Sequence, residues 1–154
     1  MLRRTLTLGA AAALLVLLVG TSASATGTAV LTKFTVVERA TSDTVVDLGA
    51  KGHSLGDMLM FGNNIYNAAN TTKIGRDEGS CWRTNPGTAW ECSWTVLVAH
   101  GSLVVQGPFY DNGRDSVLAV TGGTGVYRTA RGQMTLHARN KAGSAYDFIY
   151  SISL

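Results

Sequence analysis

The sequence has few charged residues, few histidines and no helical periodicity, and each shortage excludes a class of protein. Charged residues make up 15% of the 154-residue chain, below the roughly 25% of typical soluble domains. The 13 lysines and arginines form no basic run and are not interleaved with aromatic residues, which argues against a nucleic-acid partner. The three histidines lack zinc-motif spacing. We therefore expect no metal, no cofactor and no nucleic acid.

No hydrophobic run is long enough to span a membrane, but the chain begins with a secretory leader. Arg3 and Arg4 form a basic region, residues 6–19 are apolar, and Ala23-Ser24-Ala25 suits signal-peptide cleavage. The apolar run is shorter than the ~20 residues that a membrane-spanning helix needs. We predict a signal peptide over residues 1–25, a mature domain over 26–154, secretion, and no stable membrane span after cleavage.

Only two cysteines are present, and they suit a disulfide better than a redox site. No C-x-x-C motif occurs, and exported proteins retain disulfides. Residues 73–83 and 90–99 form the arms of an expected hairpin around an Asn-Pro-Gly-Thr turn. If the turn is centred between its proline and glycine, Cys81 and Cys92 face each other closely enough to bond. We predict that they form an intrachain disulfide.

Short segments rich in β-branched residues, separated by turns that often contain glycine, predict an all-β barrel or sandwich. Residues 63–72 are rich in asparagine and threonine, and we expect them to form a surface loop. The expected strands are residues 33–39, 44–48, 58–61, 73–83, 90–99, 102–106, 116–121, 133–139 and 145–154.

Some of these strands are apolar on both faces. In residues 94–99, 103–105 and 117–120, both alternating sets of side chains are largely apolar. A strand with one face in water alternates apolar with polar residues. We therefore expect the outer face of these strands to be covered, most simply by another copy of the chain.

A glycine-rich turn, Gly122-Gly123-Thr124-Gly125, follows one predicted strand. Its spacing differs from that of nucleotide-binding loops, and no amphipathic helix follows to receive a phosphate. We interpret it as a structural turn in which Gly123 or Gly125 has a positive φ.

This turn, with the Ala-Arg-Gly that follows it, resembles the pattern shared by plant allene oxide cyclases and dirigent proteins. The stretches Gly-Asp-Met-Leu-Met-Phe at 56–61 and Val-Gln-Gly-Pro-Phe at 105–109 extend the resemblance over residues 33–154. It implies a small antiparallel closed barrel of about eight strands. It also implies a hydrophobic cavity and a homo-oligomer, usually a trimer.

The resemblance further implies a ligand-binding set, in which Asn63 supplies a polar contact at the mouth of the cavity. The expected lining residues are Thr35, Val37, Leu59, Phe61 and Phe109. The catalytic glutamate of the cyclases aligns with Thr35, and their catalytic asparagine with Val37, so both functional side chains are missing. We assign no catalytic residue, because Glu38 reaches the cavity only if a bulge shifts the strand by one residue.

Two functions remain open. The first is a secreted binder of a small hydrophobic or phenolic molecule, similar to dirigent proteins in steering a reaction begun elsewhere. The second is an intramolecular cyclase or isomerase that uses no cofactor and orients its substrate by shape. A carboxylate that points into the cavity favours the cyclase, and an open, purely apolar cavity favours the binder.

Overall fold

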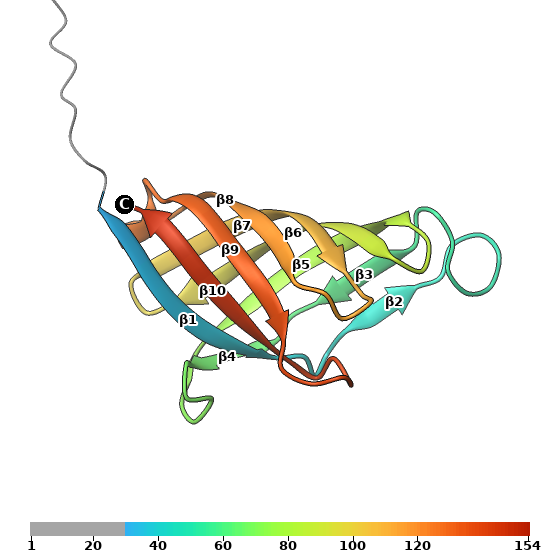
Figure 1. The fold of residues 1–154 in the computed structure, drawn as a ribbon, viewed down its shortest axis with the longest axis horizontal. Coiled ribbons are helices and arrows are strands. Elements are labelled where there is room, and N and C mark those ends of the chain that lie inside the picture. The colour runs from blue at the N-terminus through green and yellow to red at the C-terminus, as the bar shows by residue number, and fades with distance from the viewer. Residues whose placement is uncertain (1–29) are drawn as a thin grey trace, which may run out of the picture.

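Strands and glycine turns close into an antiparallel β-barrel in the computed structural model, which describes residues 30–154 (Figure 1). The predicted signal peptide lies outside the described residues. The strands are β1 (Leu31–Arg39), β2 (Thr44–Val46), β3 (Met58–Phe61), β4 (Asn64–Asn67), β5 (Lys73–Asn85), β6 (Ala89–Val98), β7 (Gly101–Tyr110), β8 (Ser116–Gly123), β9 (Arg131–Ala138) and β10 (Ala145–Ser153). One 3₁₀ turn, η1 (Gly125–Tyr127), joins β8 to β9.

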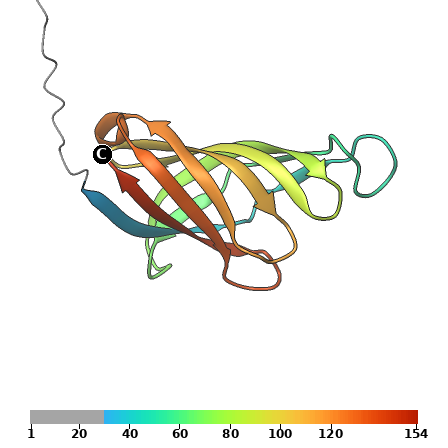
Figure 2. The ribbon, with the colours of Figure 1, turned by 45° about the horizontal axis from the view of Figure 1, so that its top comes forward.

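The barrel has eight strand positions. From β5 to β10 each strand pairs with the next, and β10 then pairs with β1. β4 and β3 pair with successive parts of β5, around residues 73–76 and 79–82, so together they occupy one position. β4 also pairs with β1, which closes the barrel, and β2 extends one end by pairing with β3 (Figure 2). The predicted all-β closed barrel is confirmed.

The segment expected to be a loop, residues 63–72, contains strand β4. Its composition disfavours strands, but β4 lies between β1 and β5 and hydrogen-bonds to both. Tertiary pairing therefore overrides local propensity. Only the residues after β4 form the expected turn, in which Asn70 has a φ of 56°.

The hydrophobic core fills the barrel interior. Its buried side chains include Trp94, Val105, Leu118, Met134 and Phe148, each from a different strand. Alternation along the strands brings these side chains to one face. Among residues 30–154, the structure contains no helix with the length and apolar character needed to cross a membrane.

Cys81 and Cys92 are opposed in the β5–β6 ladder and form a disulfide, as the hairpin register predicted. The bond closes a loop with a sequence separation of 11. Chain-entropy arguments assign a loop of this size about 3 kcal/mol of stabilisation.

Replacing both cysteines by serine should therefore lower the free energy of unfolding by about 3 kcal/mol. Urea denaturation of the oxidised wild type and the double variant measures the difference. Reduced wild-type protein is the matched control and should unfold with the variant. Equal stability of oxidised and reduced protein would contradict the prediction.

The glycine turn supports the fold through close backbone approach. Gly125 has a φ of 59°, which confirms the predicted left-handed glycine at one of its two expected positions. A side chain at Gly125 would overlap the carbonyl oxygen of His100, in the β6–β7 turn. The turn is therefore packed against a neighbouring hairpin, as a structural role requires.

Candidate functional site

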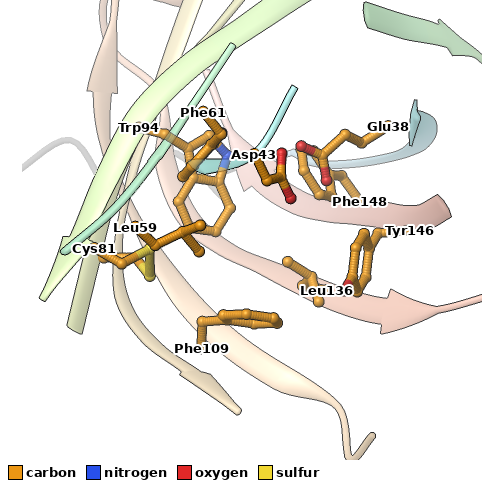
Figure 3. A pocket seen from close by; sticks show the side chains of 11 residues that line it. Glu38, Asp43, Leu59, Phe61, Cys81, Trp94, Phe109, Leu136, Tyr146 and Phe148 are labelled. Carbon is orange, nitrogen blue, oxygen red and sulfur yellow. A yellow bond between two sulfur atoms is a disulfide. The ribbon is translucent and has the colours of Figure 1, made fainter. Parts of the chain in front are cut away.

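A pocket of about 50 Å³ lies inside the barrel at the end where β1 finishes and β10 begins (Figure 3). Most of its wall is aromatic or aliphatic. The lining residues are Glu38, Asp43, Leu59, Phe61, Cys81, Cys92, Trp94, Phe109, Leu136, Tyr146 and Phe148. Trp94 lies 5.9 Å from Phe61 and 5.7 Å from Phe148 between ring centroids, so these rings form one continuous wall.

The polar side of the pocket carries two carboxyl groups. Glu38 is only 5% exposed, whereas Asp43 is exposed. The Asn63 side-chain amide joins them: its Nδ2 donates to Glu38 Oε1 at 2.8 Å and to Asp43 Oδ1 at 2.7 Å. Figure 3 shows both carboxyl groups on the same side of the pocket.

Asn63 can do this because it lies in the two-residue break between β3 and β4. There its backbone N–H donates to Asp77 Oδ1 at 2.9 Å, and the Asp77 N–H donates to the Asn63 carbonyl at 3.0 Å. The Asn63 Oδ1 also accepts the N–H groups of Thr41 and Ser42. The break in the ladder thus becomes a clamp that fixes Glu38.

Burial favours the neutral acid form of Glu38. Desolvation raises the pKa of its carboxyl well above the usual 4.5, and the nearby Asp77 charge raises it further. Burial also raises the pKa of Asp77, to about 6. Two neighbouring buried carboxyl groups cannot both ionise cheaply, so the pair favours a proton on Glu38.

Tyr146 provides a second hydroxyl donor beside Glu38. The two residues are direct partners in the β1–β10 ladder. Burial raises the pKa of the Tyr146 phenol to about 12. The phenol therefore keeps its proton and packs edge-on against Phe109, with 6.0 Å between ring centroids.

An outer recess of about 260 Å³ shares Phe109, Leu136 and Tyr146 with the pocket. The recess also contains charged side chains, among them Arg114 and Lys141 from the loops after β7 and β9. The inner pocket therefore adjoins a larger and more polar space.

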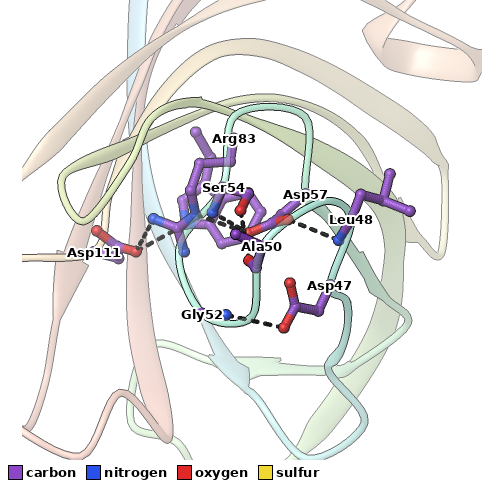
Figure 4. A network of polar contacts seen from close by, with 9 residues as sticks. Asp47, Leu48, Ala50, Gly52, Ser54, Asp57, Arg83 and Asp111 are labelled. Atoms are coloured by element: carbon purple, nitrogen blue, oxygen red, sulfur yellow. Dashed lines mark hydrogen bonds and ion pairs between the residues drawn. The ribbon is translucent and has the colours of Figure 1, made fainter.

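A second polar network holds the long β2–β3 loop (Figure 4). The buried Asp57 carboxylate accepts the backbone N–H groups of Ser54 at 2.8 Å and Leu48 at 2.9 Å. These two hydrogen bonds lower the pKa of the Asp57 carboxyl, and the bond from Ser54 has the larger effect. Beside it, Arg83 donates to Asp111, a residue of the outer recess, at 2.8 Å. This network is a structural support for that end of the barrel.

The structure brings three of the predicted ligand residues together: Leu59, Phe61 and Phe109 line the inner pocket. Asn63 is buried behind Glu38 and is not among the lining residues. Thr35 borders a different pocket, and Val37 is fully buried and lines neither.

The sequence predicted that Thr35 and Val37 face the barrel interior. The structure instead turns the alternate set of β1 residues inward. The β1–β10 ladder runs from Leu31 to Arg39 without a bulge. Strict alternation along it turns Phe34, Val36 and Glu38 inward. Glu38 thus reaches the pocket without the bulge that the alignment required, and the cavity keeps a carboxyl group.

Sequence reasoning missed Asp43, Asp77 and Tyr146. Asp77 had a usable signal, because it lies four residues before Cys81 and so shares its strand face. Asp43 follows a strand in an unremarkable loop and gave no signal. Among residues 30–154, no group of three histidine, cysteine or acidic side chains is arranged to hold a metal ion.

The raised pKa of Glu38 predicts a pH-dependent stability. An acid with a raised folded-state pKa stabilises the fold below its ordinary pKa, and this contribution is lost as the pH rises through the folded value. Glu38→Gln should therefore gain stability relative to wild type from about pH 4.5 upward. Thermal melts of both proteins across this range test it. Parallel curves would show that Glu38 titrates normally.

Solved structures of catalytic and dirigent barrels share this fold. A pyocyanin demethylase is 21% identical, with a TM-score of 0.66, over 77% of this chain and 100% of that one. A pterocarpan synthase dirigent protein is 15% identical, with a TM-score of 0.61, over 80% and 92%. An exo-specific intermolecular Diels-Alderase is 12% identical, with a TM-score of 0.63, over 80% and 98%.

A protein-family model matched to the sequence agrees with the structural similarity. The model described as allene oxide cyclase matches residues 28–152, which is nearly all of the predicted mature domain. The resemblance seen in the glycine turn and its flanking stretches is thereby confirmed. The chain belongs to the allene oxide cyclase family.

Proposed function

We propose that this protein is a cofactor-independent cyclase or isomerase that acts on a small hydrophobic molecule in the Glu38 pocket. One observation carries the proposal: a buried carboxyl group lines a pocket that is otherwise mainly apolar. A purely binding cavity has no need of a desolvated acid, which is costly to bury.

Glu38 in its acid form donates a hydrogen bond, or a proton, to an oxygen atom of the substrate. The aromatic wall formed by Phe61, Trp94 and Phe148 stabilises positive charge that develops on the substrate carbon skeleton. Ring closure exchanges a π bond for a σ bond, and the proton returns to Glu38. The reaction needs no oxidant and no cofactor.

The size of the site limits the substrate. The inner pocket, at about 50 Å³, accepts only a flat reacting group. The rest of the molecule occupies the outer recess of about 260 Å³. Together the two spaces lie at the lower end of the roughly 300–1,000 Å³ that is usual for ligand sites, so the substrate is small. Arg114 and Lys141 outnumber Asp111 in the recess, which favours a neutral or anionic outer end of the substrate.

The second candidate is a dirigent-like binder that steers a reaction begun elsewhere. The apolar residues around the pocket favour it, because Leu59, Phe61 and Phe109 bind by burial without chemistry. It takes a small hydrophobic or phenolic ligand in the same place.

One assay separates the two candidates. An allene oxide generated in the mixture by an allene oxide synthase closes to a cyclopentenone, and closure in free solution gives equal enantiomers. A cyclase produces an excess of one enantiomer, measured by chiral chromatography. A dirigent-like binder instead retains a co-purifying hydrophobic molecule, detected by mass spectrometry, and does not accelerate closure of the allene oxide. If the assay gives neither result, both proposals are wrong.

We also infer that the protein is secreted, since the disulfide suits an oxidising compartment. Sequencing the N-terminus of protein recovered from the culture medium tests this. A mature N-terminus at Thr26 supports cleavage after Ala25, and retention of the uncleaved chain in the cytosol contradicts it.

We expect a homotrimer that covers an uncharged row on the outer barrel surface. Val117, Thr135, Ile149 and Thr35 are successive neighbours across β8, β9, β10 and β1. Val117 is 49% exposed and Ile149 is 41% exposed. Sedimentation should give three times the mature mass, and Ile149→Lys should shift it toward monomer. A monomeric wild type would contradict the prediction.

A further inference from the structure

A second pocket, of about 280 Å³, lies along a different part of the barrel from the Glu38 pocket. It is lined by residues 34–36 in the middle of β1 and by Tyr150 in the second half of β10, whereas the Glu38 pocket is lined by Glu38 near the end of β1 and by Tyr146 and Phe148 in the first half of β10. Because these strands are antiparallel partners, the two sites lie at successive positions along the same ladder. They share no lining residue.

The second pocket differs from the first in charge. No ionisable acid or base lines it apart from the phenols of Tyr127 and Tyr150. Aliphatic side chains such as Val98 and Leu103 form much of the wall. A charged ligand would lose its hydration there without compensation, so the pocket suits a neutral molecule.

Its aromatic residues form a flat wall. Phe34 stacks on Tyr150 with 4.8 Å between ring centroids and 16° between ring planes. Tyr127, from the η1 turn, lies 6.4 Å from Phe34 in a tilted arrangement. Such a surface packs well against a planar, unsaturated ligand.

Tyr150 also carries an unused hydrogen-bonding group. Its side chain is fully buried, and its hydroxyl has no hydrogen-bond partner among the described residues. A buried polar group without a partner costs about 1–3 kcal/mol, so a phenylalanine would serve packing better. Burial raises the pKa of this phenol, which therefore remains a donor.

We propose that this second pocket, defined by Phe34, Val98, Tyr127 and Tyr150, binds a small, neutral, planar molecule through a hydrogen bond from the Tyr150 hydroxyl to a carbonyl or ether oxygen. The site shares no lining residue with the Glu38 pocket, and the proposal does not rest on the proposed cyclase activity.

The neutral naphthalene ketone Prodan is a suitable probe. It is planar, it carries one carbonyl acceptor, and its emission moves to shorter wavelength when that carbonyl loses a hydrogen bond. Titration of the mature protein should show saturable binding. Tyr150→Phe keeps the ring and removes the donor, so it should weaken binding about three- to tenfold, the value of one hydrogen bond, and shift the bound emission to shorter wavelength.

Two matched substitutions identify the pocket. Val98 and Leu59 are both half-buried aliphatic residues, one lining each pocket. Val98→Phe should fill the second pocket and reduce Prodan affinity at least tenfold, whereas Leu59→Phe should leave it unchanged. Thermal melts confirm that each variant is folded before titration.

The possible outcomes are distinct. Tyr150→Phe should melt no lower than wild type, since its hydroxyl has no partner among residues 30–154. If Tyr150→Phe melts lower and binds Prodan like wild type, the hydroxyl supports the fold and the proposal is wrong. Absence of Prodan binding in wild type, or loss of binding in Leu59→Phe but not in Val98→Phe, also overturns it. Failure of the cyclase assay bears on the Glu38 pocket alone.

Discussion

Replacing Glu38 by glutamine is expected to reduce turnover of a cyclising substrate by a factor of about 10²–10⁴, the usual contribution of a positioned general acid. Glutamine has nearly the same shape, and its carbonyl oxygen can still accept the hydrogen bond from Asn63 Nδ2. It cannot give up a proton. The loss should therefore appear in kcat, with little change in KM.

Asp43→Asn is the matched control. Asp43 accepts from the same Asn63 amide at 2.7 Å and lines the same pocket, but it is exposed to solvent. Its effect should stay within about tenfold, because water solvates and screens an exposed carboxylate. Chiral chromatography of the product gives both rates.

The same pair of variants discriminates between the two proposed functions. In a dirigent-like binder, Glu38→Gln should leave ligand retention and steering almost unchanged, because burial of the ligand supplies the binding energy. Full turnover in a folded Glu38→Gln protein would exclude Glu38 as the acid, and the binder would then be the better proposal.

Asn63→Ala is expected to have the largest effect on stability, a loss of about 3–4 kcal/mol. The side chain is 2% exposed and joins the chain before β2 to the buried Glu38. Each lost hydrogen bond costs about 1 kcal/mol, and leaving a buried partner unsatisfied costs more. The Asn63 bond also lowers the Glu38 pKa, so that pKa should rise further in the variant.

Asn67→Ala is the control for this effect. Asn67 ends β4, and its amide bonds only to the exposed turn at Thr71 and Thr72. Water replaces such bonds readily, so the loss should be below about 1 kcal/mol. Urea unfolding of both variants makes the comparison, and equal losses would show that Asn63 is not the clamp inferred from its contacts.

The sequence alone determined the elements with strong local signals. The hairpin register around its Pro-Gly turn placed Cys81 opposite Cys92, because pairing in a tight hairpin follows from the turn position. The glycine-rich turn indicated a left-handed residue, found at Gly125, because only glycine adopts that conformation without cost. Together with the family resemblance, these patterns were enough to predict the barrel.

The tertiary structure decided what depended on pairing between distant strands. β4 forms because β1 and β5 both offer it hydrogen bonds, which its own sequence does not reveal. The prediction of which β1 side chains point inward was wrong by one residue. Side chains alternate with a period of two, so a shift of one residue exchanges the two faces of the strand. That shift decides whether Thr35 or Glu38 lines the inner pocket. The acid character of Glu38 arises in turn from burial near Asp77, 39 positions along the chain, and only the closed barrel brings these residues together.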